Sequence, residues 1–354
     1  MPGPVAPSPE EVASMLMHPN DSLVPNIIAC ASISLVASTT FIALRLWSRK
    51  IVRGKLRLDA SDWLALTAWV IYLPYTAVLI LVAQNGGGRH IVFVKDPRLL
   101  GILTIVDENL YTVVLALLKC SILSLYRQLF ASSRTFYRCT WIVTAVVIEW
   151  LLQVLLSTNL QCIPISASWD VNIHGTCINY GVEALVAYLL DIGTDLAILS
   201  LPIPLVLRLN TSKARKRRLV ISFAAGGGAC IVSLVQLAYI TKLGNSPDPS
   251  WTVVPNSLLG DVEILTGFLA TSIATYRPLY RFIFKEAPGT SESSKPGPYD
   301  GAAKRDTGGV EVSIGTGDAS RADSRTSRSR HGILVTEHVE LTRNEASKRK
   351  DRWK

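Results

Sequence analysis

The chain has 354 residues, of which 49% are hydrophobic and only 18% are charged, and its formal net charge is +9. Its mean hydropathy of +0.31 is high for a soluble protein, and the apolar residues are concentrated in residues 23–285. These values exclude a two-domain soluble enzyme as the default interpretation. They predict a membrane-embedded body followed by a polar tail.

Residues 1–22 precede the first apolar run and contain no Lys or Arg. A cleaved secretory signal peptide carries a basic segment ahead of its apolar core, so none is predicted here. We expect this segment to lie outside the membrane and the first apolar run to serve as an uncleaved anchor.

Seven apolar segments are each long enough to cross a bilayer. About 20 helical residues span the ~30 Å hydrocarbon core. The sequence therefore predicts an all-α membrane protein with a seven-helix bundle over residues 23–285. Charged residues shorten the uncharged runs of the third and seventh segments. The predicted spans are residues 23–47, 62–84, 102–126, 139–160, 180–207, 219–241 and 257–277.

Basic residues gather in the loops after the first, third and fifth spans. Cytoplasmic loops of membrane proteins are enriched in Lys and Arg. The pattern therefore places the N-terminus outside and the C-terminus in the cytoplasm, with the plasma membrane as the expected location. Because the charge does not form one face of a folded domain, nucleic-acid binding is not expected. The basic residues of these loops are Arg49, Lys50, Arg53, Lys55 and Arg57; Arg127, Arg134 and Arg138; and Arg208, Lys213, Arg215, Lys216, Arg217 and Arg218.

Cys162 and Cys177 lie in the predicted outer loop between the fourth and fifth spans. An outer loop faces an oxidising compartment, in which paired cysteines form disulfides. We therefore expect a Cys162–Cys177 disulfide, with two free thiols as the alternative.

Residues 286–354 are rich in small polar residues and in charges of both signs. Such a segment cannot bury enough apolar surface to offset the entropy lost on folding. It is predicted to be a disordered cytoplasmic tail. Together with the inner loops, it is the expected contact for a cytoplasmic signalling partner.

Several charged residues fall within the predicted spans. Ionisable groups in a membrane are costly, so they usually face the interior of a bundle and find partners. Asp191 and Asp195 are four residues apart and share one helix face, and Lys119 lies at a depth from which its ammonium can reach Asp195. We expect a buried ion pair among these residues. A direct role in ligand binding or proton movement is the alternative.

Four more acidic residues are expected near the outer ends of the third and seventh spans: Asp107, Glu108, Asp261 and Glu263. With Arg89 and His90 in the second loop, they form the predicted ligand-contact zone, and solvation at the membrane interface is the alternative. The ligand expected there is a small or lipophilic molecule. The histidines are too few and too isolated to predict a metal site, and no cofactor is expected.

Local motifs follow one another in a characteristic order along the chain. They are Leu58-Asp59-Ala60-Ser61-Asp62-Trp63, Gly86-Gly87-Gly88-Arg89-His90, Leu118-Lys119-Cys120-Ser121-Ile122-Leu123-Ser124-Leu125-Tyr126-Arg127, Gln161-Cys162-Ile163-Pro164-Ile165 with Trp169-Asp170 and Cys177, and Thr194-Asp195 with Leu201-Pro202-Ile203-Pro204. This order resembles the fungal seven-helix rhodopsin-domain family, which includes receptor-like members and members encoded in toxin gene clusters. The resemblance runs from about Leu23 to Phe284. It departs at Gln236, where members often carry Arg, and at Ala274, where they usually carry Pro.

The family resemblance implies a receptor-like fold, but two of its possible functions lack their residues. A retinal Schiff base needs a membrane-embedded Lys, classically in the last helix, and there is none from Ser257 to Tyr276. No retinal chromophore is therefore predicted. The pair Tyr126-Arg127 has no acid before it, so coupling to a G protein does not follow.

The leading prediction is a receptor-like or sensor-like membrane protein, associated with secondary metabolism and without a retinal chromophore. Two alternatives remain open. One is a membrane-embedded cyclase that uses Asp195, Glu149 or Glu263 as its acid. The other is a transporter that uses the same charges, although no internal repeat is visible.

Overall fold

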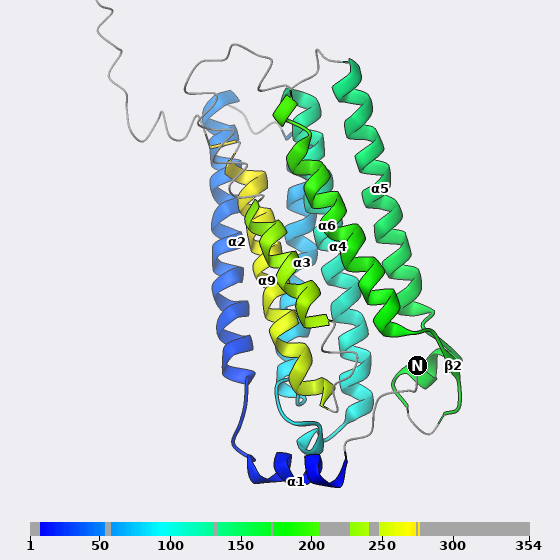
Figure 1. Ribbon diagram of the computed structural model, residues 1–354. Helices are drawn as coiled ribbons and strands as arrows, with labels where there is room; N and C mark the ends of the chain where they lie inside the picture. Colours follow the sequence, from blue (N-terminus) through cyan, green and yellow to red (C-terminus); the bar gives the residue numbers. More distant parts are fainter. Residues whose placement is uncertain are drawn as a thin grey trace, which may run out of the picture. The chain divides into compact units, whose positions relative to one another are not determined.

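The computed structural model describes residues 8–53, 58–129, 134–170, 173–204, 227–240, 248–273 and 275–276. Within these ranges the protein is a bundle of long helices that lie side by side (Figure 1). The predicted disordered tail lies outside the described residues, as does most of the basic loop after the fifth span.

Five of the described helices are long and apolar enough to cross a membrane: α2 (Val24–Arg53), α3 (Ala60–Gln84), α4 (Pro97–Leu129), α5 (Arg134–Asn159) and α9 (Pro249–Ile273). Two more complete the described part of the bundle. The helix α6 (Tyr180–Ser200) is 21 residues long and carries three carboxylates, and the helix Gly227–Ile240 is shorter. The described residues thus confirm a helical membrane protein.

Short elements lie at one end of the bundle. They are α1 (Pro9–Met17), η1 (Ile91–Phe93), β1 (Cys162–Ile163), η2 (Ile165–Ser168) and β2 (Thr176–Cys177). The two strands pair in antiparallel fashion with Cys162 opposite Cys177, and a disulfide joins these two cysteines. The predicted disulfide is confirmed. The helix α1 was not predicted, although Ser8 and Glu11 form a capping box at its start.

The chain runs back and forth, so each end of the bundle gathers alternate helix termini. The disulfide end holds the starts of α2, α4, α6 and α9 and the ends of α3 and α5, together with the Cys162–Cys177 bridge. The opposite end is called the arginine end, because Arg45 lies buried there between α2 and α3. The helix α3 packs against α2 and α4, α4 also contacts α5, α6 and α9, and α2 contacts α9.

The interior of the bundle contains both a hydrophobic core and many buried polar side chains, whereas the outer surface is strongly apolar. This distribution is expected of a bundle in lipid, where polar groups find partners inside. The most buried large residues of the core are Tyr72, Tyr75, Leu79, Val114, Leu118, Leu123, Ile264 and Phe268. Large apolar side chains exposed on the outside include Ile33, Val36, Trp63, Ile142, Leu152, Leu156 and Ile231.

Several helices extend beyond the spans that the sequence predicts. The largest difference is in α9, which starts at Pro249 rather than at residue 257 and continues through Pro255. The apolar run alone misplaces this start, because Pro255 and the polar residues around it do not end the helix. Asp261 and Glu263 therefore lie in the middle of α9, not near its outer end. The predicted span 219–241 is described as a helix only over Gly227–Ile240.

Candidate functional site

A cavity of about 100 Å³ opens between α3, α4, α5, α6, the helix Gly227–Ile240 and α9. Its lining comes mainly from the first halves of α4, α6 and α9 and from the second halves of α3 and α5, so it lies in the half of the bundle nearer the disulfide end. Several water molecules or a small ligand would fill this volume. Its residues include Asp107, Glu108, Tyr111, Tyr188, Asp191 and Asn256.

A buried cluster of charges lies next to the floor of the cavity. The ammonium of Lys119 on α4 is 2.6 Å from Oδ1 of Asp191 and 2.9 Å from Oδ1 of Asp195, both on α6. It also donates to Oγ1 of Thr194 at 2.9 Å. The ring of Trp150 lies 5.1 Å from this ammonium, in a cation–π arrangement. The predicted partners Lys119, Asp191 and Asp195 therefore meet in one place.

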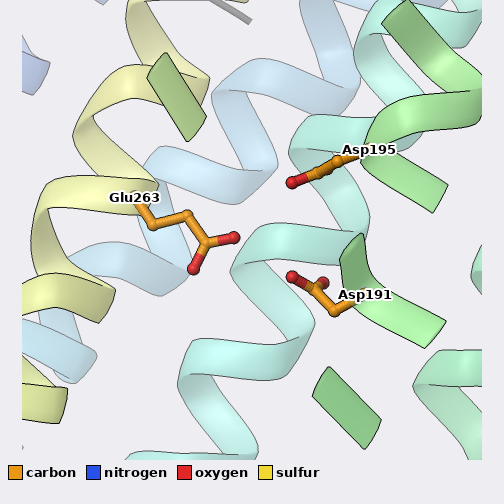
Figure 2. Close-up of side chains that lie close together, drawn as sticks. All are labelled: Asp191, Asp195 and Glu263. Carbon is orange, nitrogen blue, oxygen red and sulfur yellow. The ribbon is translucent and has the colours of Figure 1, made fainter. Parts of the chain in front are cut away.

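Glu263 on α9 joins the same cluster from the opposite side (Figure 2). Its Oε1 accepts from the hydroxyl of Ser233 at 2.9 Å, and its Oε2 accepts from the hydroxyl of Tyr111 at 2.6 Å. In its better amide orientation, Gln236 also donates to Oε2 at 2.8 Å. Gln236 thus places an uncharged amide beside the carboxylate of Glu263.

Three carboxylates of the cluster approach closely enough to suggest a metal site. One oxygen each from Asp191, Asp195 and Glu263 lies within 4.8 Å of the others, and all three residues are buried. The Lys119 ammonium, however, already contacts two of them. It supplies the positive charge that a metal ion would bring, so this arrangement fits an internal ion cluster better than a metal centre.

The four acids of the predicted ligand-contact zone separate into three environments. Asp107 and Glu108 line the cavity. Glu263 lies beneath it, in the ion cluster. Asp261 turns to the other side of α9, where its Oδ1 accepts from the hydroxyl of Tyr72 at 2.7 Å and its Oδ2 accepts from the thiol of Cys30 at 3.4 Å. The four acids thus do not form one surface.

Arg89 and His90 hold a loop against the start of α9 instead of lining the cavity. Nδ1 of His90 lies 2.6 Å from Oδ2 of Asp248, and the His90 ring stacks on Trp251 with 4.8 Å between centroids. The hydroxyl of Ser250 donates to the Arg89 carbonyl at 2.9 Å. The preceding glycines make this turn possible, since Gly86 and Gly88 have φ values of 109° and 85°.

A second buried ion network, which the sequence did not predict, closes the arginine end. Arg45 is 1% exposed, and its Nη2 lies 2.8 Å from Oδ1 of Asp62 on α3. It also donates to the Thr271 carbonyl on α9 and, at 3.0 Å, to the hydroxyl of Ser61. Arg49 contacts Oδ2 of Asp62 at 3.1 Å. A sequence signal for this network exists. Arg45 and Arg49 are one helical turn apart and so share a helix face, and Asp62 lies in the first turn of the next helix, α3.

The fungal rhodopsin domain matches residues 44–282 of the chain. The chain belongs to this family. It is 30% identical to the SAT4 family membrane protein of Emericella nidulans over 240 residues, which make up 65% of this chain and 60% of that protein. It is 27% identical to Receptor GIN3 of Arthrobotrys oligospora over 242 residues, 65% of this chain and 56% of that protein.

A longer similarity links this fungal rhodopsin domain protein to the polyenoic acids biosynthesis gene cluster protein Ba17b of Metarhizium anisopliae. The two are 24% identical over 333 residues, 85% of this chain and 90% of the relative. The chain thus covers only about 60% of the first two relatives but nearly all of this third one. No solved structure matches it significantly. The family and the apolar helices together identify a multi-pass membrane protein.

Proposed function

We propose that this protein is a receptor-like or sensor-like protein of the plasma membrane that binds a small lipophilic ligand from outside. In this proposal seven helices cross the bilayer: the five long apolar helices, α6 and the helix Gly227–Ile240. The carboxylates of α6 do not prevent it from crossing, because Asp191 and Asp195 face the ion cluster rather than lipid.

The proposed orientation puts the disulfide end outside and the arginine end in the cytoplasm. Disulfides form in oxidising compartments, and Cys162–Cys177 lies at the first of these ends. Arg49 and Arg127, from two of the basic regions, lie at the second. Exposed aromatic side chains also mark the arginine end, namely Trp47, Trp63, Tyr137 and Trp141, as expected where a bundle meets the membrane surface.

The observation that carries the proposal is the position of the cavity above the ion cluster. Asp191 belongs to both, because it lines the cavity and also binds Lys119. A ligand that contacts Asp191 therefore acts on a group that connects α4 with α6, and Ser233 and Glu263 extend the connection to two further helices. Binding that favours one arrangement of this cluster would shift the helices toward it, and the inner loops and tail would present the change to a cytoplasmic partner.

A retinal chromophore is not part of the proposal. The sequence of α9, Pro249–Ile273, contains no Lys. The deeply placed Lys119 is on α4, and its ammonium is engaged by Asp191, Asp195 and Thr194. If Lys119 formed a Schiff base with retinal, it would lose these contacts. The buried carboxylates of Asp191, Asp195 and Glu263 would then surround a weaker cation.

A membrane-embedded cyclase of secondary metabolism is the second candidate, favoured by the relative named for polyenoic acid biosynthesis. The carboxylates first considered for its acid do not line the cavity. Glu149 is on an exposed face of α5, and Asp195 and Glu263 lie in the ion cluster. An enzyme with its active site in this cavity would have to use Asp107 or Glu108 as its acid. A transporter would have to move its cargo past the same two residues.

Filling the cavity tests the proposal. Ala184 lines the cavity and is buried, so Ala184→Phe is expected to occupy it, whereas Ala145→Phe on the exposed face of α5 is the matched control. A deletion strain carrying either variant at equal surface abundance would be profiled for metabolites and transcripts. We expect Ala184→Phe to reproduce the transcript changes of the deletion without accumulation of a precursor. An accumulated precursor with loss of one product would instead favour the enzyme.

A further inference from the structure

The charge of the cavity lining is entirely of one sign. Asp107, Glu108 and Asp191 contribute carboxyl groups, and among the described residues none of those lining the cavity is Lys, Arg or His. The nearest cation, Lys119, is directed at Asp191 and Asp195 from beneath. A ligand that carries a negative charge would therefore enter a site without a partner for it.

Three oxygen acceptors of the lining are buried and have no hydrogen-bond donor among the described residues. They are Oδ1 of Asp107, Oδ2 of Asp191 and Oδ1 of Asn256. Asp191 is 3% exposed, and its other oxygen is held by Lys119. Buried acceptors are normally paired, because an acceptor left without a donor loses its hydrogen bonds to water and gains none in return. In the rest of the described chain, such atoms occur on Gln153, Thr158 and Ser272, none of which lines the cavity.

The remaining walls suit a cation with an apolar body. Tyr75, Tyr111, Trp150 and Tyr188 all line the cavity, and aromatic faces attract ammonium groups as well as apolar groups. The lining thus combines carboxylates, unpaired acceptors and aromatic rings. These are the groups that recognise a protonated amine attached to a small apolar skeleton.

We infer that the ligand of this cavity is a small lipophilic amine, whose ammonium group pairs with Asp107 and whose far end donates a hydrogen bond to Oδ2 of Asp191. This inference rests on the proposed ligand-binding function. Asp107 is the anchor because its Oδ1 is buried without a donor among the described residues, which is not so for Glu108, and because Asp191 is shared with Lys119. Asp107 on α4 and Asp191 on α6 both line the cavity. The ligand is therefore long enough to reach both residues, with its ammonium group at one end and its donor at the other.

The floor contact explains how such a ligand would be sensed. A donor placed on Oδ2 of Asp191 draws negative charge away from Oδ1, which binds Lys119. The Lys119 ammonium would then lean toward Asp195, 2.9 Å away on the same helix α6. Ligand binding and the arrangement of the ion cluster are coupled in this way through a single carboxylate.

The test uses the full chain purified into lipid nanodiscs at pH 7 and measures its melting temperature against ligand concentration. The probes are matched pairs in which an alcohol replaces the amine and the far end carries a donor: 6-aminohexan-1-ol with 1,6-hexanediol, tyramine with 4-(2-hydroxyethyl)phenol, and tryptamine with tryptophol. The variants are Asp107→Asn, Ala184→Phe and the control Glu149→Gln, which changes an exposed carboxylate on α5.

We expect at least one amine to bind at least tenfold more tightly than its alcohol. Asp107→Asn should reduce this preference to threefold or less, while Glu149→Gln should leave it unchanged. Should Asp107→Asn not fold, the comparison of amine with alcohol on the unchanged chain still decides the question.

Three results would overturn the inference. In the first, no amine binds more tightly than its alcohol, or Asp107→Asn leaves the preference intact. In the second, sodium or magnesium chloride stabilises the protein through Asp107 and the amines do not, so that the acceptors serve a metal ion. In the third, amines and alcohols bind equally and Ala184→Phe abolishes both, which would keep the ligand cavity and reject only the charge of the ligand.

Discussion

At the arginine end, Arg45 donates from Nε, Nη1 and Nη2, and both carboxylate oxygens of Asp62 are engaged. Toward the disulfide end, Asp107, Asp191 and Asn256 each keep a buried oxygen for which the described part of the chain provides no donor. Both regions contain buried charged groups. Among the described residues, those at the arginine end are fully paired with other groups of the chain, whereas those beside the cavity are not. A fully paired network stabilises one arrangement of helices, whereas unpaired acceptors beside a cavity leave interaction energy for a ligand. Under the proposed function, the arginine end stabilises the bundle and the disulfide end recognises the ligand.

The largest effect is expected from opening the arginine network. Asp62→Ala leaves the Arg45 guanidinium buried and without its carboxylate, and Arg cannot become neutral by losing a proton. We expect the free energy of unfolding to fall by about 3–5 kcal/mol, measured by thermal or denaturant unfolding in detergent. Glu149→Ala, on an exposed face of α5, is the control and should change it little. An equally small loss for Asp62→Ala would show that the network does not hold this end together.

A smaller loss is expected from cutting the covalent link at the other end. The Cys162–Cys177 disulfide closes a loop with a sequence separation of 15, which corresponds to about 3 kcal/mol of chain entropy. Trp169 of this loop lies against Gly101 at the start of α4, close to the cavity. Cys162→Ser should therefore reduce both stability and ligand affinity. Replacement of the free thiol in Cys139→Ser should affect neither, and a loss of the same size there would point to a general effect of thiol removal.

The ion cluster below the cavity should tolerate a loss of charge better than the arginine network does. Lys119→Met removes the ammonium that contacts Asp191 and Asp195, but carboxylates can take up protons, so we expect a loss of about 1–3 kcal/mol. The double variant Lys119→Met with Asp191→Asn should recover part of it, because one of the unpaired charges is removed as well. Unfolding curves of the two variants decide this point. A double variant less stable than the single one would contradict the assigned role of Lys119.

The smallest effect is local to α1. Ser8 donates its backbone N–H to Glu11 at 2.7 Å, and this hydrogen bond lowers the pKa of Glu11 below its ordinary value. The contribution of the carboxylate is therefore complete at neutral pH and is lost as the pH falls below about 4.3 and through the lowered pKa. Amide hydrogen exchange in α1 should become faster in that range and should change less in Glu11→Gln, whose amide has no such titration. The same pH response in both proteins would exclude this cause.

Individual residues show where sequence reasoning reached the site and where it did not. Lys119, Asp191 and Asp195 were expected to meet, because a lone ammonium in an apolar helix needs carboxylates at the same depth. Glu263 was assigned to the wrong environment, since its depth was counted from the apolar run and not from the true start of α9. Arg45 was missed because a charge at the end of an apolar run fits the membrane surface as well as the interior.

The sequence by itself determined that this protein lies in a membrane and roughly which segments form its helices. Long apolar runs indicate lipid, one cysteine pair indicates a disulfide, and basic loops predict an orientation. Each of these patterns can be read locally. Only the tertiary structure decided which side of each helix meets which neighbour. A helix rotates its side chains by about 100° per residue, so the partners of Asp261, Glu263 and Arg45 depend on how neighbouring helices are turned and shifted against one another. The donor-free acceptors of the cavity exist only as a result of that packing.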